Sequence, residues 1–454
     1  MKRTALLLAL LPLLSHAAAT ERFAAGHLQF TLDGSERANF SYQLLCLAGK
    51  IPCSRAAYEQ LWRKELGWKA EDDANLYEFG KLLELETGER ALRAPFPPNF
   101  PRLYDNMSRE ARLLAILLSA RRPSRMERKF ESTGATKVDA ARIRALAATY
   151  HPRFLVWWRK EGRALCERYP KELAGVIREH RLDAYLLQMA YLLEPGQQFK
   201  RPVEMHAIAR PAYAKSTSSA TQISDQVLLE VSPGDVALRR VSLLVHETVH
   251  LFYAAATRKR HMALMQEFAG HRDEAAGSYY AFFNEALATA AGAVVDKRLM
   301  PGDYERDGPN WRYHHPFIPS LARALVPLVE ERLGSNQPLL VGIAGPYIAA
   351  AGREMGPLAR TLAFRFGFRV TTGESALVNS MRQVLLAAAP PTVSLYGMEP
   401  LDRFAHINVV RLEIQPGGRP AELLEARTAK SLELKLTAPD AVSMEKWIRT
   451  VFAR

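Results

Sequence analysis

The segment Leu243–Phe252 reads LLVHETVHLF, so an HExxH pattern at His246, Glu247 and His250 stands between apolar residues. Apolar residues on both sides of such a pattern predict a helix that is buried over most of its circumference. Residues four apart share one helix face, so both imidazoles can hold one cation while Glu247 lies beside it. We therefore expect a helix over about 236–256 that carries a metal site.

A second helical pattern, over about 278–299, carries the candidate for the third metal ligand. Glu285 follows Asn284 there, and a catalytic zinc usually takes three protein ligands and leaves a fourth position for water. Close packing against another helix is favoured by the small residues Ala286, Ala288, Ala290, Ala291 and Gly292. Glu274 is a competing third ligand, but its charged neighbours favour a solvated turn.

Zinc held by two imidazoles and a carboxylate lowers the pKa of a bound water from about 15.7 toward about 7. In this scheme Glu247 is the general base that takes the proton of the water and passes it to a leaving amine. A further donor usually stabilises the developing oxyanion. The candidates for it are Tyr347, Tyr313, His314 and His315, although a buried structural aromatic is the alternative explanation for each.

Together, His246, Glu247 and His250 with the pair Asn284 and Glu285 resemble the gluzincin metallopeptidases, the thermolysin and aminopeptidase type. The resemblance implies one zinc ion per chain with His246, His250 and Glu285 as ligands and Glu247 as general base. It also implies a core made of a short sheet, the HExxH helix and the glutamate helix. It covers only about residues 203–299.

Two departures from the gluzincin pattern limit what the resemblance implies, and one further pattern is excluded. Thermolysin-like enzymes carry an aspartate four residues after the third ligand, and it orients a zinc histidine. This chain has Thr289 at that position, so the resemblance does not determine which groups orient the ligands. We find no segment of the Gly-Ala-Met-Glu-Asn type, which disfavours an exopeptidase of that kind. The metzincin pattern fails because Ala256 stands where its third histidine would be.

The N-terminus has the pattern of a cleavable export signal. Lys2 and Arg3 precede an apolar run over 5–14, and a small-residue site predicts cleavage after Ala19. The run is short for an uncleaved membrane anchor, which is the alternative, and we expect no membrane span elsewhere. The chain is therefore expected to be periplasmic or secreted from a bacterium.

The formal charge of +13 favours acidic partners such as cell-wall carboxylates. The charge is scattered and no nucleic-acid-reading motif is present, so we expect no nucleic-acid binding. In an oxidising compartment the close pair Cys46 and Cys53 is a candidate disulfide, whereas Cys166 is expected to be a buried thiol.

The pattern along the chain predicts an α+β fold that is mainly α-helical. We expect a signal peptide over 1–19, a mainly helical N-terminal region over 20–200, a metallopeptidase-like catalytic domain over 201–389 and a small α+β C-terminal region over 390–454. Helices are expected within 42–193 and over 320–333, 346–366, 374–388 and 442–452, and a long loop over 300–319. Strands are expected over 27–32, 203–209, 226–231, 392–396, 408–414 and 432–437.

Taken together, the sequence predicts an exported zinc metallopeptidase that hydrolyses peptide bonds in proteins or cell-wall peptides. The alternative is a non-catalytic binding protein of the cell envelope with a structural or vestigial metal site. A structural zinc site has four protein ligands, whereas a hydrolase keeps one position open. The number of converging ligands therefore separates the two hypotheses.

Overall fold

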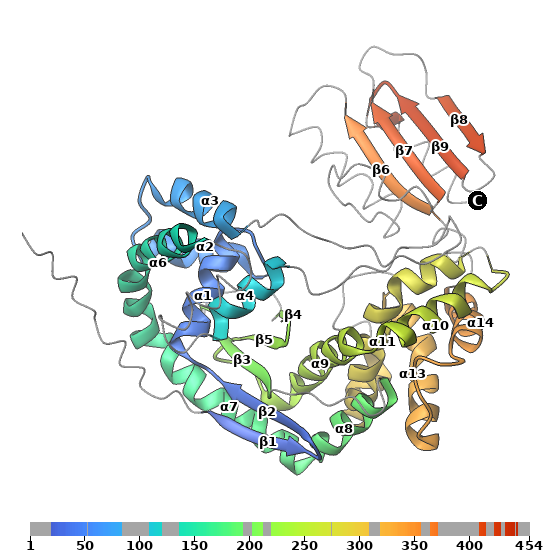
Figure 1. The fold of residues 1–454 in the computed structure, drawn as a ribbon, viewed down its shortest axis with the longest axis horizontal. Helices are drawn as coiled ribbons and strands as arrows, with labels where there is room; N and C mark the ends of the chain where they lie inside the picture. The colour runs from blue at the N-terminus through green and yellow to red at the C-terminus, as the bar shows by residue number, and fades with distance from the viewer. Residues whose placement is uncertain are drawn as a thin grey trace, which may run out of the picture. The chain divides into compact units, whose positions relative to one another are not determined.

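The computed structural model describes residues 20–51, 53–83, 109–119, 136–193, 202–211, 219–273, 275–307, 318–355, 364–370, 408–414, 422–427, 432–440 and 442–443. They fall into two compact units. The first unit comprises the chain up to 87 with 109–179 and 199–237, and the second unit comprises the remainder. Helices predominate and sheets accompany them, so the predicted α+β, mainly helical class is confirmed (Figure 1).

The first unit is built around a sheet with the strand order β1-β2-β3-β5-β4. Its strands are β1 (Glu21–Ala25), β2 (Leu28–Asp33), β3 (Val203–Ala209), β4 (Ala220–Ile223) and β5 (Gln226–Val231). The three central strands are parallel, and each edge strand is antiparallel to its neighbour. The strands expected over 203–209 and 226–231 are confirmed, and β2 overlaps the strand expected over 27–32.

Helices of the first unit cover this sheet. They are α1 (Glu36–Leu47), α2 (Arg55–Lys64), α3 (Asp72–Leu83), α4 (Arg109–Ser119), α6 (Lys137–Trp157), the π-helical turn η1 (Trp158–Gly162) and α7 (Arg163–Glu179). Both α1 and α7 pack on β3, and α7 also packs on β1 and β2. Ser35 caps α1, and Thr136 with Asp139 forms a capping box on α6, which satisfies free N–H groups at the two helix starts.

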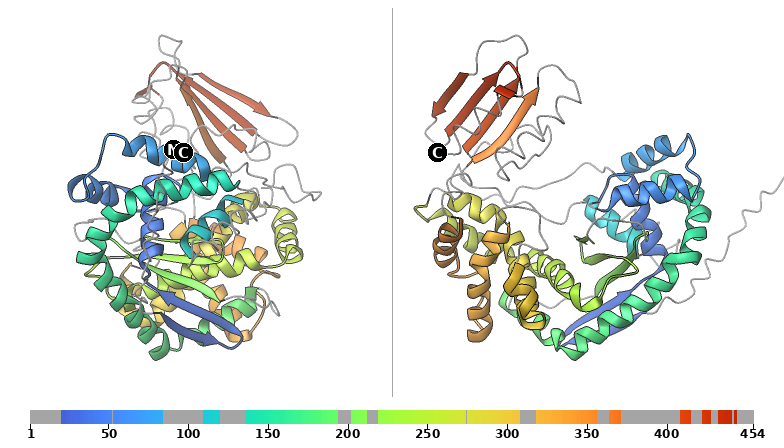
Figure 2. Two further views of the ribbon diagram at one scale, coloured as in Figure 1. Left: turned by 60° about the vertical axis from the view of Figure 1, so that its left-hand side comes forward. Right: turned by 180° about the vertical axis from the view of Figure 1, so that it is seen from behind.

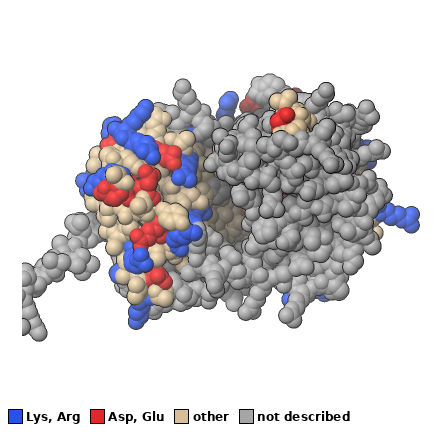
Figure 3. All heavy atoms as spheres, turned by 90° about the horizontal axis from the view of Figure 1, so that it is seen from above, with Lys and Arg blue, Asp and Glu red and all other residues tan. Residues whose placement is uncertain are grey.

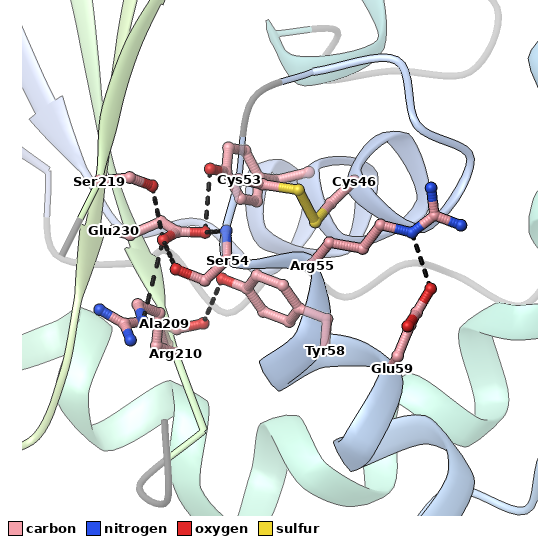
Figure 4. The surroundings of a disulfide bond; sticks show 11 residues. Cys46, Cys53, Ser54, Arg55, Tyr58, Glu59, Ala209, Arg210, Ser219 and Glu230 are labelled. Atoms are coloured by element: carbon pink, nitrogen blue, oxygen red, sulfur yellow. Dashed lines mark hydrogen bonds and ion pairs between the residues drawn. A yellow bond between two sulfur atoms is a disulfide. The ribbon is translucent and has the colours of Figure 1, made fainter. Parts of the chain in front are cut away.

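The predicted disulfide between Cys46 and Cys53 is present, and Cys166 is a buried free thiol as expected. The disulfide lies beside the fully buried carboxylate of Glu230 on β5 (Figure 4). Ser54, the residue after Cys53, donates to Glu230 from its backbone N–H at 3.1 Å and from its hydroxyl at 2.6 Å.

Three more groups surround the same carboxylate. The hydroxyls of Tyr42 and Ser219 donate to Glu230 at 3.0 and 2.7 Å, and the guanidinium of Arg210 lies 3.8 Å away. A buried charge is tolerated only when it is paired and hydrogen-bonded, and Glu230 meets both conditions. Glu230 thereby ties α1, the disulfide turn and the strands β3 and β5 together (Figure 4).

The second unit holds the remaining helices. They are α8 (Leu182–Leu193), α9 (Val241–Ala255), α10 (Arg258–Ala269), α11 (Ala276–Leu299), α12 (Pro301–Asp307), α13 (Ile318–Ser335) and α14 (Ala344–Met355). The long helix α11 packs against α9 and α13, and α9 and α11 lie side by side in both views of Figure 2. The hydroxyl of Tyr185 on α8 donates to the carbonyl oxygen of Ala291 at 2.9 Å and fixes α8 to α11.

The second unit also contains a four-stranded sheet with the order β6-β7-β9-β8. Its strands are β6 (Phe364–Val370), β7 (Asn408–Ile414), β8 (Glu422–Arg427) and β9 (Leu432–Ala438). Strands β6, β7 and β9 are parallel, and β8 runs antiparallel to β9. The strands expected over 408–414 and 432–437 are confirmed.

Some predicted elements differ from the structure. The loop expected over 300–319 contains α12 and the start of α13, because Pro301 stands at the first position of a helix, where its missing N–H costs nothing. A helix was expected over 346–366, but α14 ends at Met355, shortly before Pro357. The last three residues of the expected range, 364–366, belong to strand β6 instead.

The start of α9 also differs from expectation. The carboxylate of Asp235 accepts the backbone N–H of Ser232 at 2.8 Å in the segment where the helix was expected to begin. A short 3-10 helix, η2 (Ala237–Arg239), then precedes α9, whose N-cap Arg240 makes no side-chain capping bond. Three further predicted elements lie wholly or mostly outside the described residues. They are the helix over 374–388, the strand over 392–396 and, apart from its first two residues, the helix over 442–452.

None of the described helices is long and apolar enough to cross a membrane. Residues 1–19, which carry the expected signal, lie outside the described residues. On the described part of the face in Figure 3, Lys and Arg side chains lie among Asp and Glu side chains. This mixture agrees with the scattered charge in the sequence.

Candidate metal centre

The two histidines of the HExxH pattern lie on one face of α9, as their spacing predicts. Most residues of this helix are buried, and the side chains of His246 and His250 are only 10% and 12% exposed. Their rings meet edge to face, and the two Nε2 atoms are 3.0 Å apart. This close approach turns two coordinating nitrogens toward one point.

Glu285 on α11 completes the group. Its carboxylate oxygens lie 3.2 Å from Nε2 of His246 and 3.3 Å from Nε2 of His250. Within the described residues, these three side chains are the one group of histidine, cysteine or acidic residues whose ligand atoms converge. The structure thus brings together the three predicted ligands, although they come from two helices.

Small residues allow this convergence, as the sequence predicted. Gly292 of α11 faces α9, where a Cβ at its position would lie 2.8 Å from the carbonyl oxygen of Ser242 and 3.8 Å from Cβ of His246. Real Cβ atoms do not approach an oxygen so closely, so any larger residue would push the helices apart. Gly292 lies seven residues after Glu285, about two helical turns, so both face α9.

Each histidine is also held at its other ring nitrogen. Nδ1 of His250 lies 3.1 Å from the amide oxygen of Asn284, and Nδ1 of His246 lies 3.4 Å from the hydroxyl of Thr289. An amide oxygen only accepts hydrogen bonds, so Nδ1 of His250 carries a hydrogen. In the neutral ring its Nε2 is then a bare acceptor, which is the form that binds a metal.

Electrostatics show how strongly the three side chains interact. Burial alone would lower the pKa of His250, but the hydrogen bond and negative charge of Glu285, with the charge of Glu247 and the bond to Asn284, raise it to about 9. Burial alone would raise the pKa of Glu285, but its bonds to His246 and His250 and their charges hold it well below its usual range. The site therefore favours positive charge at its centre.

The geometry fits zinc. Donors of a tetrahedral zinc with bonds of about 2.0–2.1 Å lie about 3.3 Å apart, close to the 3.0–3.3 Å separations seen here. With both Nδ1 atoms engaged, three electron-pair donors face one point, and they repel one another unless a cation or protons lie between them. The residues present therefore suit a divalent cation in both donor type and spacing.

Glu247, the predicted base, lies on α9 directly after His246. Its side chain is 8% exposed, and its Oε1 is 3.9 Å from Nε2 of His246, so it stands beside the three donors without being one of them. A buried carboxylate next to a metal ligand has the position that a proton acceptor requires.

Other predicted candidates are not supported by the described residues. Tyr347 is fully buried, with its ring against Phe268, Tyr279 and Phe283, and burial raises its pKa well above the usual value. Tyr279 and Phe283 lie on a different face of α11 from Glu285, so these contacts favour an aromatic core role for Tyr347. The candidates Glu274, Tyr313, His314 and His315 lie outside the described residues.

The sequence pattern placed Asn284 in a motif but did not predict its hydrogen bond to His250. Its position directly before the third ligand, on a helix expected to pack against another helix, could have indicated this contact. Comparison with known proteins identifies no matching family model, no matching curated protein and no matching solved structure. The geometry of this site is therefore the basis for assigning a function to the chain.

Proposed function

We propose that this chain is a zinc-dependent metallopeptidase of the gluzincin type, with one zinc ion held by His246, His250 and Glu285. The observation that supports the proposal most directly is the convergence of these ligand atoms from α9 and α11, with donor separations of 3.0–3.3 Å. Two imidazoles and one carboxylate are a donor set of catalytic zinc sites in hydrolases.

Zinc in such a site supplies an acidic water and a Lewis acid for a carbonyl group. Asn284 and Thr289 hold the imidazoles in place, and the charge of Glu285 balances part of the charge of the ion. Glu247 accepts the proton of the attacking water and delivers it to the leaving amine. Peptides or proteins, including cell-wall peptides, are the proposed substrates.

The alternative of a structural zinc in a binding protein requires a fourth protein ligand. Among the described residues the converging donors number three, which favours a position left for water. The proposal also includes export, with cleavage after Ala19, which mass determination of the mature protein from the periplasm or medium would test.

Glu247→Gln is the decisive variant. It removes the base while leaving the three ligands, so we expect about one zinc per chain, measured by elemental analysis, and at least a hundredfold loss of hydrolysis of a quenched fluorescent casein. Glu331→Gln on the exposed side of α13 makes the same chemical change far from the site and serves as the control. Full activity of Glu247→Gln would remove this residue as the base, and a wild-type chain without zinc would refute the proposal.

A further inference from the structure

Thr289 of α11 lies next to His246 of α9. It lies four residues after Glu285 and therefore on the same helix face. Its side chain is buried, with the residue only 8% exposed, and its hydroxyl oxygen is 3.4 Å from Nδ1 of His246. Asn284, one residue before Glu285, makes the corresponding contact with His250 at 3.1 Å.

We infer that Thr289 is a positioning residue that holds His246 with its Nδ1 hydrogen-bonded and its Nε2 directed at the metal, so that both zinc histidines rest on neutral partners. This inference rests on the metal centre of the proposed function. Beyond the proposed function, it concerns two properties of that centre, namely its affinity for zinc and the net charge of the bound ion.

Both partners of the histidines, Asn284 and Thr289, have uncharged side chains. A hydroxyl accepts a hydrogen bond from Nδ1–H but carries no charge, so it raises the electron density at Nε2 less than a carboxylate would. The two imidazoles, when neutral, and their partners Asn284 and Thr289 carry no charge, so Glu285 supplies the negative charge among these five side chains. A zinc ion held by them would keep a net charge of about +1, which lowers affinity and strengthens its action as a Lewis acid.

The lengths of the two contacts predict their order. At 3.4 Å the Thr289 contact is longer than the usual range of about 2.7–3.2 Å, whereas the Asn284 contact lies within it. The hydroxyl therefore restrains His246 less firmly than the amide restrains His250. Position 289 is thus the place where a stronger acceptor would change the centre most.

The test compares zinc affinities of the full mature chain, measured by competition with a chromophoric chelator. Thr289→Val keeps the shape but removes the acceptor, and we expect about a tenfold weaker affinity, the lower end of the range of such losses. Thr289→Ser restores the hydroxyl and is expected to stay within about threefold of wild type. Thr289→Asp adds the carboxylate and is expected to bind zinc more tightly.

Thr248→Val is the matched control. Thr248 on α9 is fully buried between the two histidines in sequence, but its hydroxyl donates to the carbonyl oxygen of Leu244 in its own helix at 2.7 Å. This variant loses the same group from the same pair of helices without touching an imidazole. Its zinc affinity is expected to stay within about threefold of wild type.

Cobalt gives a second measurement, because the visible absorption of bound Co²⁺ reports ligand geometry. We expect Thr289→Val to alter the cobalt spectrum while Thr289→Ser and Thr248→Val leave it unchanged. If Thr289→Val has the zinc affinity and the cobalt spectrum of the wild type, the inference is overturned, but the proposed metal centre is not. Absence of zinc binding in the wild-type chain would overturn both the inference and the proposed function.

Discussion

Gly292 of α11 lies directly against the backbone carbonyl of Ser242 on α9, at a distance that leaves no room for a Cβ atom. This contact sets the separation of the two helices that supply the metal ligands. The position of Glu285 relative to the histidines therefore depends on a residue that touches no ligand atom of the metal.

The first prediction concerns this glycine. Gly292→Ala is expected to lower the free energy of unfolding by about 1–3 kcal/mol, because the added methyl group forces the helices apart. Zinc affinity should fall with it, since Glu285 moves away from the histidine pair. Chemical denaturation and chelator competition measure the two effects.

Gly352→Ala on α14 is the control for Gly292→Ala. It makes the same change within a helix where a Cβ meets nothing within 4 Å, so it should gain about 0.5–1 kcal/mol of stability through helix propensity. Equal effects of the two substitutions would show that contact with Ser242 is unimportant.

The third ligand provides the second prediction. Glu285→Gln removes the anionic donor, and we expect at least a hundredfold weaker zinc binding. The pKa of His250 should also fall from about 9, because Glu285 is the main group that raises it. NMR titration of the histidines in the metal-free protein tests the second effect, and an unchanged pKa would contradict the ion pairing described here.

Zinc affinity should depend on pH in a defined direction. In the metal-free protein His250 holds a proton below about pH 9, and zinc must displace it. We expect the apparent affinity to fall by up to about tenfold for each unit of pH below 9, and to level off above it. Affinities measured in metal-buffered solutions from pH 6.5 to 10 test this, and a flat profile would contradict it.

The metal-free protein should show the opposite trend in stability. The raised pKa of His250 contributes stability that is fully present below its ordinary value of 6.5 and is lost as the pH rises toward about 9. The lowered pKa of Glu285 contributes stability that is present above its ordinary value of 4.5 and is lost in acid. Unfolding of the chelator-treated protein between pH 5 and 9 should therefore become easier as the pH rises, and less so in Glu285→Gln.

The disulfide gives the last prediction. Reduction of the Cys46–Cys53 bond opens a short loop and is expected to cost about 2 kcal/mol of stability. It also frees Ser54, so Ser54→Ala should cost less after reduction than before. A double Cys46→Ala, Cys53→Ala variant is the control, because its stability should not respond to a thiol reductant.

Sequence patterns predicted the elements whose signal is local. Strands β3 and β5 are short, mostly apolar segments that interrupt the helical pattern. Helix α9 has apolar residues on both sides of two candidate ligands that are four residues apart. Strand β1 was missed because it is short and begins with the adjacent charged residues Glu21 and Arg22, as an edge strand with alternate residues exposed can. Strand β4 was missed because it is short and its first residues, Ala220 and Thr221, continue a polar stretch of the sequence that is rich in Ser and Thr.

In the candidate site, too, local patterns predicted some features, whereas others depend on how the helices pack. The face shared by His246 and His250 follows from helix periodicity, and the choice of Glu285 came from a motif resemblance. The contacts of Asn284 and Thr289 depend on the rotation and separation of two helices, which local patterns do not determine. The same holds for Glu230, whose donors come from segments far apart in the chain.

Strand β2 pairs in parallel with β3, and the side chains of Asp33 and His206 meet across that pairing although they are 173 positions apart. A polypeptide emerging from a ribosome or a translocation channel cannot complete this sheet until β3 to β5 have followed. Loop closure over such a span is slow, so the early strands stay open to other partners in the meantime. The unpaired edge of β2 is therefore exposed to aggregation for longer than a strand whose partner follows it closely in the chain.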